Sequence, residues 1–213
     1  MSWGKYYALP VHWKSKSWFF FVCFVSAVVI SAYFDEPARY FFFTIHGHID
    51  DAVCSRVHWF GTGWANFYLF IGFYVIGFIL RKEKTRLTGL MILQSYLYSG
   101  AITIALKSLV GRWRPGIGHG HLTFSPFVAT PNAHLSFPSG DVAVVFSLTA
   151  VMMSLSKNIL WKAIWIILAI LTSLSRIYYD AHWLSDVVFS IVNAVVAGMW
   201  VVKRYEAERA IIE

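Results

Sequence analysis

The sequence predicts an all-α integral membrane protein, and three observations support this fold class. Hydrophobic residues make up 58% of the 213 residues and charged residues only 14%, whereas an ordinary soluble domain has roughly 25% charged residues. Six apolar runs approach the length of about 20 residues that a helix needs to cross a bilayer. Lys and Arg residues gather in alternate connections between these runs. We therefore predict a six-helix membrane bundle that forms one domain over residues 1–213.

The six predicted spans follow one another along the whole chain. They are Ser17–Phe34, Trp64–Leu80, Leu87–Leu106, Ser139–Ser156, Ile159–Ser175 and His182–Val202. The last three are marginal in length or carry polar residues at one end. No cleavable signal peptide is evident, because the first apolar run follows Lys14 and Lys16 and is typical of a retained span.

The connection Asp35–Gly63 separates the first two spans and contains a distinct aromatic stretch. Tyr40–Phe43 is followed by His46, His48 and two aspartates. We expect this segment to lie as a helix in the membrane interface, beside the polar ends of the spans. Its histidines could touch a substrate, but a solvated turn explains them more simply.

The distribution of cations predicts the orientation. An even number of spans puts both termini on one side, and twelve of the eighteen Lys and Arg residues fall at the termini or in the second and fourth connections. These are Lys5, Lys14, Lys16, Arg81, Lys82, Lys84, Arg86, Lys157, Lys162, Lys203, Arg204 and Arg209. Positively charged connections usually face the cytoplasm. We expect a cytoplasmic (inner) membrane protein with both termini in the cytoplasm, whose first, third and fifth connections face the periplasm or exterior. Its net charge of +7 is expected to meet anionic lipid and not nucleic acid.

A candidate nucleophile lies between the last two spans. His182 and Asp186 are four residues apart, so on a helix they would share one face and the carboxylate could reach the imidazole. Such a carboxylate decides which ring nitrogen carries the proton and frees the other for attack. Arg176, just upstream, offers a planar fork of donors for phosphate oxygens.

Two further polar clusters are predicted on the same side of the membrane. Lys107 and Arg114 lie two helical turns apart at the end of the third span and would project from one face. Ser139 is a natural N-cap of the fourth span, and Gly140 would let an anion approach the free amides of that helix end. Together these residues predict a phosphate-binding cage that contains a nucleophilic histidine.

These motifs resemble those of the membrane-bound type 2 phosphatidic acid phosphatase superfamily, whose signature is K-x6-RP, then PSGH, then SR-x5-H-x3-D. The chain carries Lys107 to Arg114-Pro115, Pro138-Ser139-Gly140, and Ser175-Arg176 to His182 to Asp186, in that order and at that spacing. The resemblance implies that His182 attacks phosphorus to form a phosphohistidine and that Asp186 orients it. It also implies that Lys107, Arg114, Ser139, Gly140 and Arg176 hold the phosphoryl oxygens, with no metal or other cofactor.

The chain departs from the family pattern at Asp141, where the family has a histidine that is thought to protonate the leaving oxygen. An aspartate near Lys107 and Arg114 should be ionised at neutral pH and is a poor acid, although a bound phosphate would oppose this. Three hypotheses follow. Asp141 still delivers the proton when substrate is bound; His134, His119 or His121 has taken over this role; or the leaving group is itself a phosphate and needs little protonation.

We therefore expect a lipid phosphatase that acts on a headgroup phosphate at the outer face of the membrane. Candidate substrates are lipid A phosphates, undecaprenyl diphosphate, phosphatidylglycerol phosphate and phosphatidic acid. Arg112 and the histidines of the third connection favour slightly a large sugar phosphate such as lipid A. A lipid phosphotransferase and an inactive lipid-phosphate binding protein are the alternatives, and the sequence indicates no protein partner. The soluble haloperoxidases that share such a cage are excluded by hydropathy.

Overall fold

The structure is a computed structural model, and it describes residues 15–47, 51–127 and 132–212. Over these ranges the chain forms eight α-helices and two short 3-10 turns, Pro115–Ile117 and Asn132–His134. The α-helices are α1 (Ser15–Tyr33), α2 (Asp35–Thr44), α3 (Asp51–Trp59), α4 (Gly63–Ile79), α5 (Glu83–Val110), α6 (Gly140–Leu155), α7 (Ile159–Tyr178) and α8 (Leu184–Ile212). In this part of the chain the extended structure amounts to an isolated bridge between Arg112 and Phe124. The predicted all-α fold class is confirmed.

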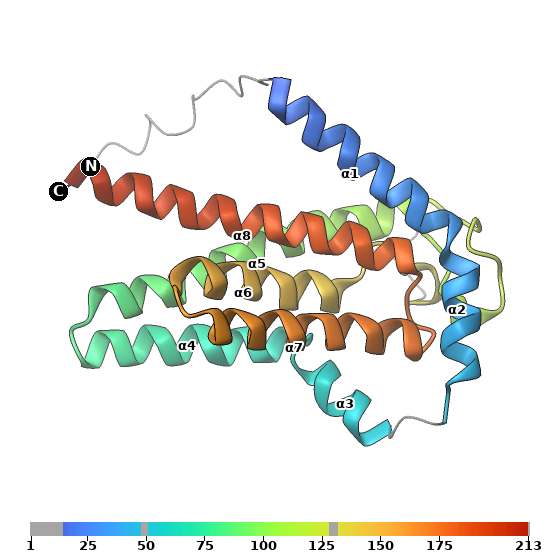
Figure 1. Cartoon of the computed structure of the whole chain (residues 1–213), viewed down its shortest axis with the longest axis horizontal. Coiled ribbons are helices and arrows are strands. Elements are labelled where there is room, and N and C mark those ends of the chain that lie inside the picture. The colour runs from blue at the N-terminus through green and yellow to red at the C-terminus, as the bar shows by residue number, and fades with distance from the viewer. Residues whose placement is uncertain (1–14, 48–50, 128–131, 213) are drawn as a thin grey trace.

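Helices α4 to α8 run side by side as a bundle, and α2 crosses one end of it (Figure 1). The α4–α5 and α6–α7 turns lie at the opposite end, together with the C-terminal part of α8. The α5–α6 loop and the α7–α8 turn lie at the end that α2 crosses. Segments that are far apart in sequence and carry the predicted motifs therefore meet at this one end.

The helix lengths agree approximately with six spans. Helices α5, α7 and α8 are each long and apolar enough to cross a bilayer, whereas α6 is apolar but has only 16 residues. Two further spans arise if each of the bent pairs α1–α2 and α3–α4, with bends of 51° and 48°, is counted as one. The segment that the sequence predicts to lie in the interface forms two helices, α2 and α3, and the bent pairs include each of them in a span. His48 and Asp50 lie outside the described residues.

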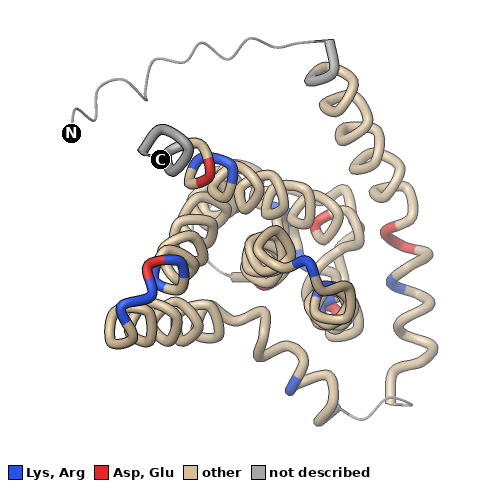
Figure 2. The backbone as a smooth tube through the Cα atoms, turned by 60° about the vertical axis from the view of Figure 1, so that its left-hand side comes forward, with Lys and Arg blue, Asp and Glu red and all other residues tan. Residues whose placement is uncertain are grey.

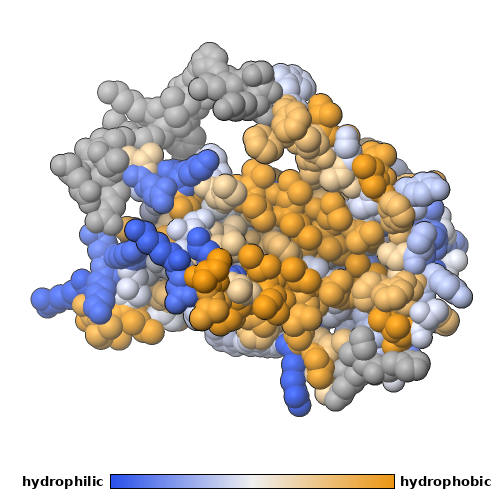
Figure 3. Space-filling model, viewed as in Figure 1, coloured by the Kyte–Doolittle hydropathy of each residue, from blue (hydrophilic) through white to orange (hydrophobic). Residues whose placement is uncertain are grey.

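The outer surface of the bundle is strongly apolar. Large side chains such as Phe20, Ile104 and Ile159 have at least 70% of their area exposed. Figure 3 shows an apolar belt across the middle of the molecule with hydrophilic residues gathered at one end. In Figure 2 charged residues cluster at the α4–α5 turn and near the end of α8, while long stretches of the helices carry none. This pattern fits lipid contact in the middle and water or headgroups at the ends.

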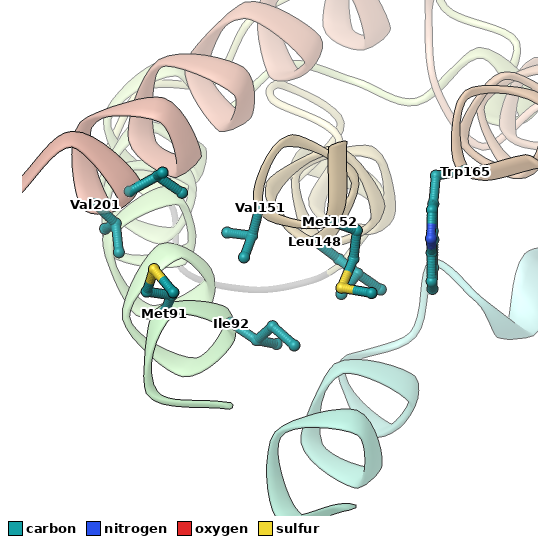
Figure 4. Packing of buried hydrophobic residues seen from close by; sticks show 8 residues of the cluster. Met91, Ile92, Leu148, Val151, Met152, Trp165 and Val201 are labelled. Atoms are coloured by element: carbon teal, nitrogen blue, oxygen red, sulfur yellow. The ribbon is translucent and has the colours of Figure 1, made fainter. Parts of the chain in front are cut away.

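The core of the bundle fixes the relative positions of α5, α6 and α8. Ile92, Leu148, Val151 and Val201 are completely buried and pack together (Figure 4). Helix α8 also approaches α6 closely at Gly198, where a Cβ atom would lie only 2.6 Å from that of Ala150. Because interiors pack as densely as crystals, these contacts hold the three helices in fixed positions relative to one another.

Candidate active site

The turn before α8 holds the candidate nucleophile. Helix α8 begins at Leu184, so His182 precedes it and is not on the same helix face as Asp186, contrary to the sequence-based expectation. His182 Nδ1 lies 3.7 Å from Asp186 Oδ2, which is longer than a hydrogen bond. Its hydrogen-bond partner is instead the carbonyl oxygen of Ser136, at 2.7 Å. A carbonyl can only accept, so Nδ1 carries the proton and Nε2 keeps its lone pair.

Asp186 supports this turn from behind. It is completely buried, and its Oδ2 accepts hydrogen bonds from the backbone N–H of Trp183 at 2.9 Å and from Ser136 Oγ at 2.5 Å. A side chain in the first helical turn that accepts from the preceding backbone N–H forms half of a capping box. Asp186 therefore holds together the segment that carries His182 and the segment that carries the Ser136 carbonyl.

The imidazole of His182 is itself buried, with 3% of the residue exposed. Removal from water disfavours the charged form of a histidine. Burial lowers the pKa of His182 to about 4. At neutral pH the ring is therefore uncharged, which is the form that can attack an electrophile.

The last turn of α5 and the loop after it carry two of the predicted phosphate ligands, Lys107 and Arg114. Helix α5 ends at Val110, and Gly111 continues in a left-handed conformation with φ of 59°, a typical glycine position at a helix C-terminus. Arg114 has an extended backbone and does not share a helix face with Lys107. The sequence-based expectation was wrong on this point because the helix ends at the glycine, four residues before Pro115.

Arg114 reaches the site from this loop and is tied down on several sides. Its backbone N–H donates to Ala133 O at 2.9 Å. Its guanidinium donates to the backbone and side-chain oxygens of Asn132, each at 3.0 Å, and to Ala181 O at 3.3 Å. Burial and the neighbouring Arg176 lower the pKa of this guanidinium. Two such cations close together favour an anion between them.

Lys107, in the last turn of α5, approaches the N-terminus of α6. Its Nζ donates to Leu135 O at 2.5 Å. A Cβ atom added at Gly140 would lie 3.9 Å from Lys107 Cε, an ordinary contact distance. The structure therefore brings Lys107 to Gly140 as predicted, and the role of Gly140 in anion binding stays a prediction.

Ser139 occupies the N-cap position of α6, as predicted, but its side chain makes no capping hydrogen bond. Its Oγ is buried and has no hydrogen-bond partner among the described residues. A buried hydroxyl without a partner is costly. Arg176 Nε is likewise buried without a hydrogen bond. These two unsatisfied groups are the donors that a phosphate could accept from.

Asp141, in the first turn of α6, contacts different cations from those expected. Its Oδ2 lies 2.9 Å from Arg176 Nε, an ion pair whose N–H is not aligned with the contact. The same oxygen lies 3.2 Å from His58 Nε2 of α3. Lys107 and Arg114 interact with Asp141 only through longer-range electrostatics. Sequence reasoning missed His58, since its own neighbours in the sequence form no motif.

The other candidate histidines face elsewhere. His121 pairs with Glu36 at 3.3 Å, and His119 and His134 pack edge-on against Trp113, each with ring centroids 4.0 Å apart. In the described part of the chain no hydrogen bond or ion pair joins these three histidines to Asp141 or His182. The described residues therefore show no contact that supports the hypothesis that one of these histidines replaced the general acid of the family pattern.

Arg112 is turned into the protein and not toward a headgroup. Only 4% of the residue is exposed, and its guanidinium pairs with Asp35 at 2.7 Å and with Asp186 at 2.6 Å. It also donates to His121 O at 2.9 Å and 2.8 Å. The expectation that Arg112 adds polarity for a sugar phosphate was wrong, since the sequence does not distinguish a buried arginine from an exposed one.

Comparison with known proteins decides the family. The sequence model of the PAP2 superfamily matches residues 88–210, more than half of the chain. The chain belongs to the PAP2 superfamily. This confirms the resemblance drawn from the motifs, and membership supports phosphatase activity in general. A search of curated protein sequences gave no match.

Two solved structures resemble the chain. LpxE of Aquifex aeolicus is 26% identical with a TM-score of 0.58, over 76% of this chain and 93% of LpxE. The first transmembrane PAP2-type phosphatidylglycerolphosphate phosphatase from Bacillus subtilis is 20% identical with a TM-score of 0.68, over 87% of this chain and 96% of that protein. The second likeness shows the fold alone. Together with the apolar helices, these neighbours make the chain a multi-pass membrane protein.

Proposed function

We propose that this PAP2 protein is an integral membrane lipid phosphatase that hydrolyses a phosphomonoester or diphosphate of a membrane lipid through a phosphohistidine. The observation that carries the proposal is the hydrogen bond of His182 Nδ1 to the Ser136 carbonyl. It leaves Nε2 unprotonated, and Lys107 and Arg114 are close enough to interact electrostatically with the ring. A neutral nucleophile beside cations suits attack on an anionic phosphate.

The surrounding donors match the charge that develops during phosphoryl transfer. Ser139 Oγ and Arg176 Nε are unsatisfied donors, and Lys107 and Arg114 hold backbone carbonyls that they can exchange for phosphate oxygens. Such donors stabilise the equatorial oxygens of the transferring group as the bond to the leaving oxygen breaks. Water then attacks the phosphohistidine and releases phosphate, with no step that requires a metal.

A lipid substrate follows from the place of the site. The motif segments lie at one end of a bundle of apolar helices (Figure 1), where headgroups meet the protein directly. The positive-inside rule supports a cytoplasmic position for both termini and an outward-facing site. The proposed substrates are lipid A phosphates, undecaprenyl diphosphate, phosphatidylglycerol phosphate and phosphatidic acid. The earlier preference for lipid A rested partly on Arg112, which the structure places in the interior.

The experiment that tests this function is phosphate release by the purified protein from these four lipids in mixed micelles. Wild type should be active on at least one lipid, and His182→Ala should lose activity by several orders of magnitude. When the phosphate of the lipid is radiolabelled, the phosphohistidine should appear as acid-labile label bound to the wild-type protein. No such label should be bound to His182→Ala. Full activity of His182→Ala would refute the mechanism, and label transferred to a second added lipid would favour the phosphotransferase.

The role of Asp141 is tested with the same panel. If its carboxyl group protonates the leaving oxygen, Asp141→Asn should lose activity on monophosphates and keep it on the diphosphate, because phosphate leaves without much protonation. Asp141→His restores the residue type of the family pattern and should recover monophosphate hydrolysis. Wild type without activity on any of the lipids would favour an inactive binding protein.

A further inference from the structure

His58 reaches the site because α3 packs onto α7 and the corner that follows α3 packs against Asp141 of α6. Thr172 Oγ1 of α7 donates to Val57 O of α3 at 3.1 Å. At the following corner, a Cβ atom on Gly61 would lie 2.7 Å from Thr172 Cγ2 and 2.9 Å from Asp141 Cβ. No larger residue fits there without displacing α3. The approach of His58 to Asp141 is therefore a close-packed feature of the fold.

Asp141 contacts His58 and is close enough to His182 to interact with it electrostatically. Both recorded contacts of its carboxylate, to His58 Nε2 and Arg176 Nε, use Oδ2. Oδ1 has no hydrogen-bond or ion-pair partner within the described ranges, and 29% of the side chain is exposed. The carboxylate also interacts electrostatically with His182. One oxygen thus faces a histidine while the other is free for a ligand.

We propose that His58 supplies and recovers the proton that Asp141 exchanges with the leaving oxygen during phosphoryl transfer. This inference rests on the phosphatase function proposed above. Asp141 alone is poorly suited to donate, because Arg176 favours its ionised form. Histidine is the side chain whose ordinary titration lies nearest neutral pH. The His58–Asp141 pair thereby performs the task that one histidine performs in the family pattern.

The two chemical steps balance with one proton on the pair. His182 Nε2 forms a bond to phosphorus as the bond from phosphorus to the lipid oxygen breaks, and that oxygen keeps the electron pair and takes the proton through Asp141. His58 is then neutral and Asp141 ionised. In the second step a water oxygen attacks phosphorus and gives one proton back through Asp141 to His58. The phosphorus–nitrogen bond breaks, and its electron pair returns to Nε2.

The test compares leaving groups on two phosphates with matched lipid tails, one an alkyl ester and one an aryl ester. Loss of a general acid slows departure of a basic alkoxide far more than that of an acidic phenoxide. We expect His58→Ala to lower kcat about 100-fold or more on the alkyl ester, with less than about a tenfold loss on the aryl ester and little change in KM. His58→Gln keeps a hydrogen-bond donor for Asp141 but cannot carry the proton, so it should behave like His58→Ala.

His46→Gln is the matched control, since the exposed ring of His46 stacks on Tyr178 and it should keep wild-type activity on both esters. Equal losses on the two esters, or wild-type activity of His58→Gln, would overturn the role of His58 and indicate simple positioning of Asp141. An active wild type with unaffected His58 variants refutes this inference alone. A wild type that is inactive on both esters refutes the proposed function itself.

Discussion

Arg112 Nη1 donates a hydrogen bond of 2.6 Å to Asp186 Oδ1 in the interior of the protein. The same guanidinium donates to Asp35 Oδ2 at 2.7 Å, and Asp35 also accepts from the backbone N–H of Ser185 at 2.8 Å. One buried cation thereby joins the loop after α5, the start of α2 and the first turn of α8. Because Asp186 holds the turn that carries His182, this network positions the nucleophile from a distance.

Removal of the cation should unfold the site. Arg112→Met leaves two buried carboxylates without their partner, and breaking a buried ion pair in this way costs about 3–5 kcal/mol. We expect a large drop in the melting temperature in detergent together with loss of activity. Lys157→Met, at an exposed position of the α6–α7 turn, should change stability by less than about 0.5 kcal/mol. Equal stability of Arg112→Met and Lys157→Met would contradict the role of this network.

The acid limb of the pH–rate profile should lie unusually low. In the proposed mechanism His182 attacks in its neutral form, and burial lowers the pKa of His182 to about 4. As pH falls through that value the ring gains a proton and loses its nucleophilic lone pair, so kcat/KM should decline near pH 4 and not near 6.5. The substrate phosphate also ionises in this pH range. Comparing substrates whose second phosphate pKa values differ separates the two ionisations, since the limb that reports His182 stays at the same pH for every substrate. A fixed limb near 6.5 would show that the ring is more solvated than the structure has it.

Ser139 should matter for activity and not for stability. Its Oγ makes no capping bond, so Ser139→Ala removes an unsatisfied buried hydroxyl and should leave the melting temperature unchanged or raised. Loss of one donor to the transition state should lower kcat about 100-fold. Asn158 provides the opposite case, since its side chain accepts from Leu160 N and Trp161 N at the start of α7. Asn158→Ala should cost about 1 kcal/mol of stability without affecting turnover. The reverse pattern would mean that Ser139 is a structural cap.

Two left-handed glycines in the α5–α6 loop should respond differently to alanine. Gly111 and Gly118 have φ of 59° and 85°, and alanine in this conformation costs about 1–2 kcal/mol. At Gly118 a Cβ atom meets nothing within 4 Å, whereas at Gly111 it would overlap the carbonyl of Ser125. Gly118→Ala should therefore be mildly destabilised and active, and Gly111→Ala should lose both stability and activity because the loop that carries Arg112 and Arg114 must move. Similar melting temperatures for the two variants would contradict this packing.

Much of the fold and the main site residues could be predicted because they depend on local patterns. Apolar run lengths indicate spans, and the spacing from Arg176 through His182 to Asp186 indicates a phosphoryl-transfer motif within a few residues. The structure places Lys107 near Gly140 and Arg114 near Arg176, so the predicted clusters do converge. Their assigned roles in binding phosphate stay predictions.

The failures concern contacts set by tertiary packing. Whether Arg112 faces lipid headgroups or Asp35 depends on how α2 crosses the end of the bundle, because Asp35 is 77 residues from Arg112 in the sequence. His58 meets Asp141 across 83 residues because of the Gly61 corner. The tautomer of His182 is fixed by a backbone carbonyl, and every residue has one, so no residue type marks it. Only the early end of α5 had a local signal, in Gly111.

The short length of α6 has a consequence for how the enzyme meets its substrate. Its 16 residues span about 24 Å at 1.5 Å per residue, less than the hydrocarbon thickness of about 30 Å. If the Lys157 end of α6 lies at one surface and the helix runs along the bilayer normal, its other end stops just short of the opposite headgroup plane. We then expect a headgroup phosphate to move a few Å inward to reach Ser139. A lipid confined to the leaflet arrives at this depth by lateral diffusion, whereas a soluble phosphate ester must first shed water. The relevant concentration is then a mole fraction in the membrane plane, and surface dilution of the lipid should slow turnover even when its bulk concentration is held constant.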